Sequence, residues 1–486
     1  MLAAALAVLY AALLIPDPEA AGAGTGQPAA QVFAWDRDAY WRSLETAFSD
    51  LRREGCAAAE ARLATRFREA DGLLRQIERN PLGPDAKALG SLERLMFESG
   101  PLVGACGGRI SDYLRLAAES RRVVKKRSAD WDLAVPGTRE ALYRILYGSR
   151  AAVEEVILQM PVGAVPGLQH GTDEASQAPG VEVRGVRVHS GDILVSRGGA
   201  PTSALIARGS DYPGNFSHIA LAYVDPATRS VYAVEAHIES GVRISTLEEY
   251  LAWKNPRIMV LRPRADLAQL QRDPLLPHKA AERAYRRAKQ AHIPYDFAMD
   301  FRDHGKMFCS EVASAAYEEF GVRLWMGISR ISSPGLRRWL GGLGVRYFET
   351  EEPSDLEYDP QLAVVAEWRD PQTLRKDHYD NAVTEAMLEG AERGDELAYR
   401  LLLLPPARLA KAYSAALNLF GRVGPIPEGM SATQSLRSVW YTARHQAIGE
   451  RLAGKAERFR QQRQYEPPYW ELVRLARAAK DEIGGE

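Results

Sequence analysis

The chain has 486 residues, and its 62 Lys and Arg balance 63 Asp and Glu to a formal net charge of −1. That balance gives no support for general nucleic-acid binding, so we expect no nucleic-acid partner. With 46% apolar and 26% charged residues, the composition is that of a globular protein with room for roughly two to four domains.

The first segment is an apolar run from Leu2 to Ile15. Its length suits the core of a signal peptide and is short for a membrane span. Ala21, Gly22 and Ala23 offer a small-residue cleavage site, although the basic residues that usually precede such a core are missing. We therefore expect residues 1–24 to be a signal peptide, with an uncleaved membrane anchor or a wrongly assigned start codon as alternatives. Export to the periplasm or cell envelope follows from the first reading.

Residues 31–160 are expected to form an N-terminal helical domain. Apolar residues recur at helical spacing over 38–55, 57–78, 91–99 and 139–160. The basic run 121–127 is interpreted as a solvated helix end rather than as a contact for an anionic surface. The region contains no constellation of catalytic residue types.

The sequence contains three cysteines, Cys56, Cys106 and Cys309, which match neither a disulfide scaffold nor a zinc motif. Cys56 and Cys106 both fall in the N-terminal helical region. They could pair in an exported protein, and two buried free thiols are the equal alternative.

A Gly- and Pro-rich linker is expected at 161–180, and the pattern then changes to strands. Residues 181–345 are expected to form an α+β domain of antiparallel strands with helices to one side. Its expected strands cover 181–188, 192–197, 217–225, 230–238 and 257–263, and its expected helices 246–254, 278–291 and 309–321. An acidic connector, 349–358, leads to a C-terminal helical region over 358–486, with helices expected at 374–394, 395–404, 406–423, 433–462 and 468–484.

The stretch Gly305–Gly321 places Cys309 in the first turn of an amphipathic helix. A thiol at a helix N-terminus lies at the positive end of the helix dipole, which favours the nucleophilic thiolate. The helix is indicated by apolar residues at three- and four-residue spacing, namely Val312, Ala315, Ala316 and Phe320.

A thiolate nucleophile needs a base and a group that orients the base. His218 lies in an apolar strand run, and Glu235 lies in the next run, where a buried carboxylate requires a partner. If the two strands are adjacent and antiparallel, Glu235 can approach His218. His237 faces the same side as Glu235 and is the main competitor, as the base or as a substrate contact. Lower-ranked histidines, in loops or before the first strand, are His189, His292 and His304.

Five motifs occur in the order GDILVSRG, FSHIALAY, YAVEA, YDFAMDF and FCSEVASAAYEEFGV. This order resembles the circularly permuted NlpC-like cysteine peptidases, in particular the YiiX/YebB-like group, whose fold is papain-like. Relatives of lecithin–retinol acyltransferase share the order. The resemblance covers Gly191 to Gly321. It implies a permuted papain-like core, an antiparallel sheet plus helices, flanked by all-α regions at both ends.

The resemblance implies that Cys309 is the nucleophile, His218 the base and Glu235 the residue that orients the base. Tyr295 matches the tyrosine of a "YD" pair before the cysteine, where it could contact substrate or anchor a loop. Two further matches are Asp296 in that pair and a structural "GD" at Gly191 and Asp192. One departure is Phe308, where the group often has tyrosine.

The activity implied is acyl transfer through a Cys-His-Glu triad and a thioester, with no metal or organic cofactor. The expected substrate is an amide in cell-wall peptides, so the partner is a peptide or peptidoglycan fragment. Two alternatives are a lipid-directed thiol acyltransferase or lipase, with peripheral membrane association, and a non-catalytic binding module on the same fold.

Overall fold

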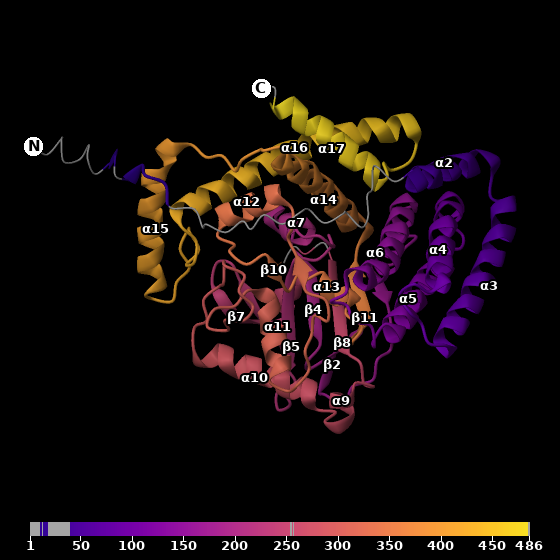
Figure 1. The fold of residues 1–486 in the computed structure, drawn as a ribbon, viewed down its shortest axis with the longest axis horizontal. Helices are drawn as coiled ribbons and strands as arrows, with labels where there is room; N and C mark the ends of the chain where they lie inside the picture. Colours follow the sequence, from indigo (N-terminus) through magenta and orange to yellow (C-terminus); the bar gives the residue numbers. More distant parts are fainter. Residues whose placement is uncertain (1–9, 12, 18–38, 253–254, 256, 485–486) are drawn as a thin grey trace, which may run out of the picture.

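The computed structural model describes residues 10–11, 13–17, 39–252, 255 and 257–484. The expected cleavage site at 21–23 and most of the expected leader lie outside these ranges. Within them, no helix is both long enough and apolar enough to cross a bilayer. Figure 1 shows a central sheet with helices of the N-terminal region on one side and helices of the C-terminal region above it.

The central sheet has seven strands, all antiparallel, in the order β1-β11-β8-β4-β5-β6-β7. Two separate two-stranded sheets are formed by β2 with β3 and by β9 with β10. The strands are β1 (Leu168–His170), β2 (Gly180–Val183), β3 (Val186–His189), β4 (Ile193–Arg197), β5 (His218–Val224), β6 (Val231–His237), β7 (Gly241–Thr246), β8 (Arg257–Pro263), β9 (Ser329–Arg330), β10 (Glu349–Thr350) and β11 (Leu362–Arg369).

Helices associated with the sheet cover both of its faces. They are α7 (Pro201–Arg208), α8 (Leu247–Ala252), α9 (Ala268–Arg272), α10 (Leu276–Gln290), α11 (Cys309–Glu318), α12 (Pro334–Leu343) and α13 (Asp355–Tyr358). Strand side chains alternate between faces, so Ile219 and Leu221 pack with α10 and α11, whereas Ala220 and Ala222 pack with α8 and the β2–β3 hairpin. The α+β class and the antiparallel sheet are confirmed.

The sheet and its surroundings extend beyond 181–345. Strand β1 falls within the range expected to be a linker, and β11 pairs with β8 after the expected acidic connector. That connector is buried and includes β10 and α13. The single strand expected at 181–188 is instead a hairpin, because the chain turns at Arg184 and Gly185, both at positive φ.

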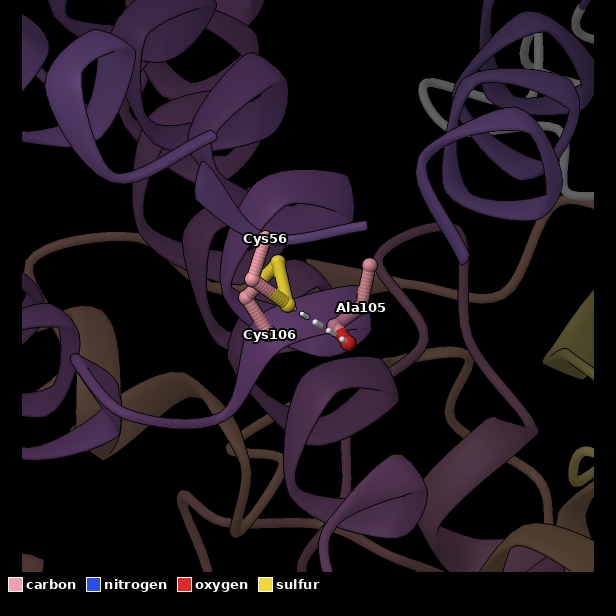
Figure 2. Close-up of a disulfide and its surroundings, with 3 residues drawn as sticks. All are labelled: Cys56, Ala105 and Cys106. Atoms are coloured by element: carbon pink, nitrogen blue, oxygen red, sulfur yellow. Dashed lines mark hydrogen bonds between the residues drawn. A yellow bond between two sulfur atoms is a disulfide. The ribbon is translucent and has the colours of Figure 1, made fainter. Parts of the chain in front are cut away.

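The N-terminal region consists of α2 (Ala39–Glu54), α3 (Ala57–Arg79), α4 (Lys87–Cys106), α5 (Ile110–Arg127) and α6 (Pro136–Gln159). A disulfide joins Cys56, just before α3, to Cys106 at the end of α4 (Figure 2). The region therefore has a covalent link between the start of α3 and the end of α4, through cysteines that are 50 residues apart in sequence.

The prediction that the basic run 121–127 is a solvated helix end is wrong. The run forms the last turns of α5, where Val123, Val124 and Lys125 are buried. Nζ of Lys125 donates to the backbone oxygen of Glu357, 2.5 Å away. Burial lowers the pKa of Lys125 to about 7. The run therefore docks the N-terminal helices onto the sheet domain.

The C-terminal region consists of α14 (Pro371–Glu392), the 3₁₀ turn η1 (Leu401–Leu403), α15 (Leu404–Asn418), α16 (Ala432–Arg463) and α17 (Tyr469–Gly484). The helix expected at 395–404 is wrong, because most of that segment is irregular and only its last residues turn. Helix α14 packs on α16 and α17 and against α7, which joins this region to the sheet domain.

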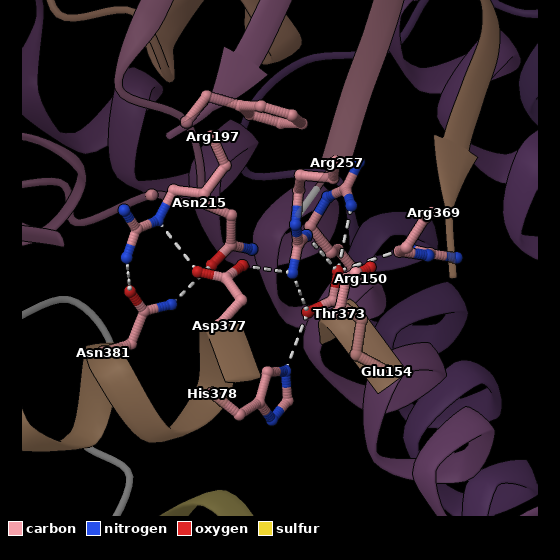
Figure 3. A network of polar contacts seen from close by, with 12 residues as sticks. Arg150, Glu154, Arg197, Asn215, Arg257, Arg369, Thr373, Asp377, His378 and Asn381 are labelled. Carbon is pink, nitrogen blue, oxygen red and sulfur yellow. Dashed lines mark hydrogen bonds and ion pairs between the residues drawn. The ribbon is translucent and has the colours of Figure 1, made fainter. Parts of the chain in front are cut away.

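Buried ion pairs join the two helical regions to the sheet (Figure 3). Glu154 of α6 accepts hydrogen bonds from Arg257 of β8 at 2.6 Å, Arg369 of β11 at 3.1 Å and His378 of α14 at 3.0 Å. Arg257 also pairs with Asp377 of α14 at 2.6 Å. Buried charges are costly unless paired, so this network fixes three parts of the chain relative to one another.

Candidate active site

Cys309 is the first residue of α11 and is 5% exposed. The capping residue Phe308 is extended, and its backbone N–H donates to Oε2 of Glu311 at 2.9 Å. This bond satisfies one of the free amides at the start of the helix. The local sequence therefore holds the thiol at a well-formed helix N-terminus.

The expected pairing of the histidine and glutamate strands is confirmed. Strands β5 and β6 are antiparallel, with Ala220 opposite Glu235. His218 lies two positions along β5 from Ala220, on the same face, and its Nε2 lies 2.8 Å from Oε2 of Glu235. The short turn between the strands brings the two side chains together because it sets their register.

Glu235 is buried and accepts from several donors. Nε2 of His237 lies 3.0 Å from the same oxygen as His218, and Ser245 Oγ donates to the other oxygen at 2.7 Å. Burial raises the pKa of Glu235, but the hydrogen bonds from His218 and His237 outweigh it and hold the pKa below its usual range. The carboxylate is therefore ionised at neutral pH.

The ionised carboxylate fixes the tautomer of both rings. Because an ionised carboxylate only accepts hydrogen bonds, Nε2 of His218 and Nε2 of His237 must both carry a proton. Nδ1 of His218 is then the ring nitrogen that can take up a proton. Ligand atoms of these two histidines and Glu235 lie within 4.8 Å of one another, and such a donor set could hold zinc. The two hydrogen bonds account for the cluster without an ion.

His218 and Glu235 lie on the sheet face that α8 covers. They share that face with Ala220 and Ala233, which pack against Tyr250 of α8. The ring of Tyr250 stacks on that of His218, with centroids 6.4 Å apart and planes inclined by 28°. Tyr250 is fully buried, so it restricts the position of the imidazole.

Cys309 packs with Ile219 and Val312 in the core under the other face, and it also lies near Tyr250, whose ring stacks on His218. The backbone N–H of Ile219 donates a hydrogen bond to its sulfur. Among the described residues, no hydrogen bond joins Sγ of Cys309 to the ring of His218. The thiol thus contacts the residue next to His218. Catalytic hydrogen bonds are commonly long before substrate binds and shorten in the complex.

The pKa of the thiol differs from the expectation drawn from the helix dipole. Burial raises the pKa of Cys309 to about 11, although hydrogen bonds from the amides of Ile219 and Ser310 oppose the rise. The expectation that the helix N-terminus would favour thiolate is wrong for the resting protein, because desolvation exceeds the effect of the donors. The thiol is held protonated and needs a base.

Tyr295 is partly buried, and burial, together with the nearby Cys309, raises its pKa well above the usual value. Its ring centroid lies 5.1 Å from that of Phe297. Asp296 accepts from the backbone N–H groups of Ala298 and Asp300, which is a loop-anchoring role. The "YD" pair therefore lies beside the cysteine, with the aspartate turned into the loop.

The "GD" pair has a structural role. Gly191 has φ +95°, and a Cβ there would lie 2.4 Å from Pro277. Asp192 accepts from Arg262 through both oxygens at 2.8 Å.

Of the lower-ranked histidines, His189 and His292 lie away from the site, and His304 lies near Glu311. His189 is buried against the backbone oxygen of Ala178, and His292 is exposed and paired with Glu428. Nδ1 of His304 lies 3.4 Å from Glu311.

Three residues at the site were not found from the sequence: Ser245, Tyr250 and Glu311. Ser245 lies on β7, a short strand with weak alternation. Tyr250 lies in the helix predicted at 246–254, and nothing in that pattern indicates a role for it at the site. Glu311 is fully buried, and burial raises its pKa to about 9, with Asp296 and Glu351 nearby. The pattern Phe308-x-x-Glu311 at a helix start is the signal that could have identified the last of them.

In the comparison with known proteins, one family model matches part of the chain. Residues 187–366 match the model of the family described as permuted papain-like amidase enzymes, YaeF/YiiX, C92 family. No curated protein and no solved structure matches the chain. The matched range includes β4, β5, β6 and α11, which carry the cluster described above. Residues 187–366 thus belong to the permuted papain-like amidase family, and the protein is a hydrolase of the cysteine peptidase and amidase type.

Proposed function

We propose that the protein cleaves an amide bond in cell-wall peptides, with Cys309 as nucleophile, His218 as base and Glu235 as the residue that orients the base. The observation that carries the proposal is the 2.8 Å contact between His218 and the buried Glu235, at the strand that Cys309 contacts. The contact fixes the imidazole with its Nδ1 available as a proton acceptor.

The reaction begins with transfer of the thiol proton of Cys309 to Nδ1 of His218, and the sulfur attacks the substrate carbonyl carbon. Glu235 stabilises the imidazolium formed. The oxyanion accepts hydrogen bonds from backbone N–H groups at the start of α11, such as that of Cys309. The intermediate collapses to a thioester, and His218 returns the proton to the leaving amine.

Hydrolysis of the thioester by water regenerates the free thiol of Cys309. His218 removes a proton from water as the oxygen attacks the thioester, and the C–S bond then breaks. The sulfur recovers a proton from the imidazolium, and the acid product leaves. Nε2 of His237 lies beside the same oxygen of Glu235 as His218, at the same end of the sheet. In this proposal His237 contacts the substrate together with Tyr295.

Export is supported by the disulfide between Cys56 and Cys106, since disulfides persist in oxidising compartments. An exported amidase has cell-wall peptides within reach. Expression with and without residues 1–24, followed by fractionation, tests the location: the full sequence should reach the periplasm, and recovery of both forms in the cytoplasm would contradict export.

The activity test uses purified protein with peptidoglycan and phospholipid vesicles in parallel. Release of new amino groups from peptidoglycan by the wild type, and not by the Cys309→Ala variant, is expected. Fatty-acid release or acyl transfer from the vesicles instead would favour the lipid-directed alternative, which rests on the shared motif order. No reaction with either substrate, and no labelling of Cys309 by a thiol-directed activity probe, would favour a binding module.

A further inference from the structure

Exposed apolar side chains are concentrated on one segment of the C-terminal region. Sixteen large apolar side chains are exposed among the described residues, and eight of them lie between 401 and 423. Phe420 is 81% exposed and Leu419 is 85% exposed. The others are Leu401, Leu402, Leu403, Leu409, Tyr413 and Val423. We call these eight residues, on η1, α15 and the turn after it, the apolar arm. A contiguous exposed apolar surface marks an interaction site.

The charged residues within the segment that carries the apolar arm are all basic. Residues 400–423 contain Arg400, Arg408, Lys411 and Arg422, and no aspartate or glutamate. Arg400 and Arg422 are exposed at the two ends of the segment. Apolar side chains interspersed with basic ones are typical of helices that lie in the interface of a membrane with anionic lipids.

Ile15 and Asp17, in the described part of the N-terminal segment, contact α15, which carries part of the arm. Arg408 of α15 hydrogen-bonds the backbone oxygen of Ile15 and pairs with Asp17 at 3.1 Å. Asp17 also accepts from Thr433 Oγ1 at 2.9 Å, at the start of α16. Figure 1 shows the coloured part of the N-terminal segment beside α15. The exposed apolar residue Ile15 therefore adjoins α15.

We propose that the apolar arm is a membrane-docking surface, which inserts into the interface of a bilayer containing anionic lipids. The contacts of Asp17 with Arg408 and Thr433 fix the position of α15, which carries part of the arm, relative to the start of α16. A second copy of the chain is a poorer occupant, because the basic residues of two arms would repel each other. The proposal concerns where the enzyme is held and does not depend on its substrate or mechanism.

The experiment places an environment-sensitive fluorophore on the arm. Phe420→Cys is labelled with NBD in the full chain carrying Cys309→Ala, and is mixed with vesicles of equal parts phosphatidylglycerol and phosphatidylcholine. A blue shift and a rise in NBD emission are expected on binding. The matched control is Val162→Cys, which is 89% exposed and lies outside the arm. Because the N-terminal run is present in both proteins, only local insertion distinguishes them.

A charge test accompanies the fluorescence. Reversal of the two exposed arginines, Arg400→Glu with Arg422→Glu, should weaken vesicle binding about tenfold or more. Lys87→Glu, at the exposed start of α4, should leave binding unchanged. Unchanged NBD emission at position 420 on bound vesicles, or equal changes at 162 and 420, would overturn the proposal. So would a vesicle-independent shift that grows with protein concentration, which would identify a second copy as the occupant.

Discussion

Nε2 of His218 and Oε2 of Glu235 lie 2.8 Å apart, across antiparallel strands of the central sheet. The glutamate is 2% exposed at its side chain, whereas the histidine side chain is 21% exposed. The buried partner thus holds a charge, and the more exposed partner can exchange protons with a bound substrate. This asymmetry supports the proposal that the ionised carboxylate of Glu235 orients the ring and that His218 acts as the base.

Glu235→Gln should lower kcat about 10- to 100-fold and leave KM nearly unchanged, because the amide still accepts one hydrogen bond but no longer stabilises the imidazolium. Cys309→Ala and His218→Ala should abolish hydrolysis while circular dichroism shows an intact fold. Ser245→Ala is the matched control, since it removes one bond to the same carboxylate and keeps the charge. Full activity of the Glu235→Gln variant would contradict the assignment of Glu235 to the triad.

His237→Ala should reduce kcat less than His218→Ala does. It removes one of the two imidazole donors to Glu235, so the carboxylate keeps its charge and its contact with His218. Steady-state kinetics on the peptide substrate measure the difference, and His237→Gln tests whether a neutral donor restores the rate. A dead His237→Ala variant together with an active His218→Ala variant would make His237 the base.

The pH dependence of thiol alkylation should report the buried state of Cys309. Burial raises the thiol pKa to about 11, so in His218→Ala the rate of iodoacetamide labelling should keep rising with pH beyond 10. If His218 accepts the thiol proton as proposed, labelling of the wild type should be faster than that of His218→Ala at neutral pH. Mass spectrometry of the peptide containing Cys309 separates this signal from Cys56 and Cys106. Coincident profiles in the two proteins would contradict a role for His218 in deprotonating the thiol.

The contact of His218 with Glu235 could be predicted because it is local. Two apolar runs with a short turn between them specify an antiparallel pair, and the pairing then brings the polar side chains together. The helix that starts at Cys309 followed in the same way from its periodicity. Both predictions depend on apolar patterns within about 20 residues of sequence, and periodicity is informative over stretches of that length.

Features that depend on distant contacts could not be predicted. Strand β11 contains a register shift between Val364 and Ala366, which breaks its alternation. Lys125 is buried because its acceptor, the backbone of Glu357, lies 232 residues away in sequence. The raised pKa of Cys309 likewise depends on packing against β5. Helix position alone indicates a reactive thiol, and only the tertiary structure reveals the cost of burying its charge.

Chelation should leave the hydrolase active, and added zinc should inhibit it. Glu235 and the two histidines are joined by hydrogen bonds, so dialysis against EDTA should change the rate by less than about twofold. Zinc would compete for Nε2 of His218 and for the carboxylate. His237→Ala removes one of the three ligands and should weaken zinc inhibition, as measured by inhibition curves at constant pH. Loss of activity on chelation, restored by zinc, would instead indicate a metal-dependent reaction.

Glu154→Ala should destabilise the protein by about 3–5 kcal/mol, because it removes one negative charge from a buried network in which the arginines share their carboxylates. Glu154 is 1% exposed and contacts Arg257, Arg369 and His378 from three other elements. Chemical unfolding should show the loss, and limited proteolysis should show earlier cleavage between the sheet domain and both helical regions.

The matched control for this prediction is Glu182→Ala. The pair of Glu182 with Arg187 is 4.0 Å long and solvent-exposed, so its loss should change the free energy of unfolding by less than about 1 kcal/mol. Equal effects of the two substitutions would mean that the buried network does not hold the regions together. A large effect of Glu154→Ala with unchanged proteolysis would mean that it stabilises α6 alone.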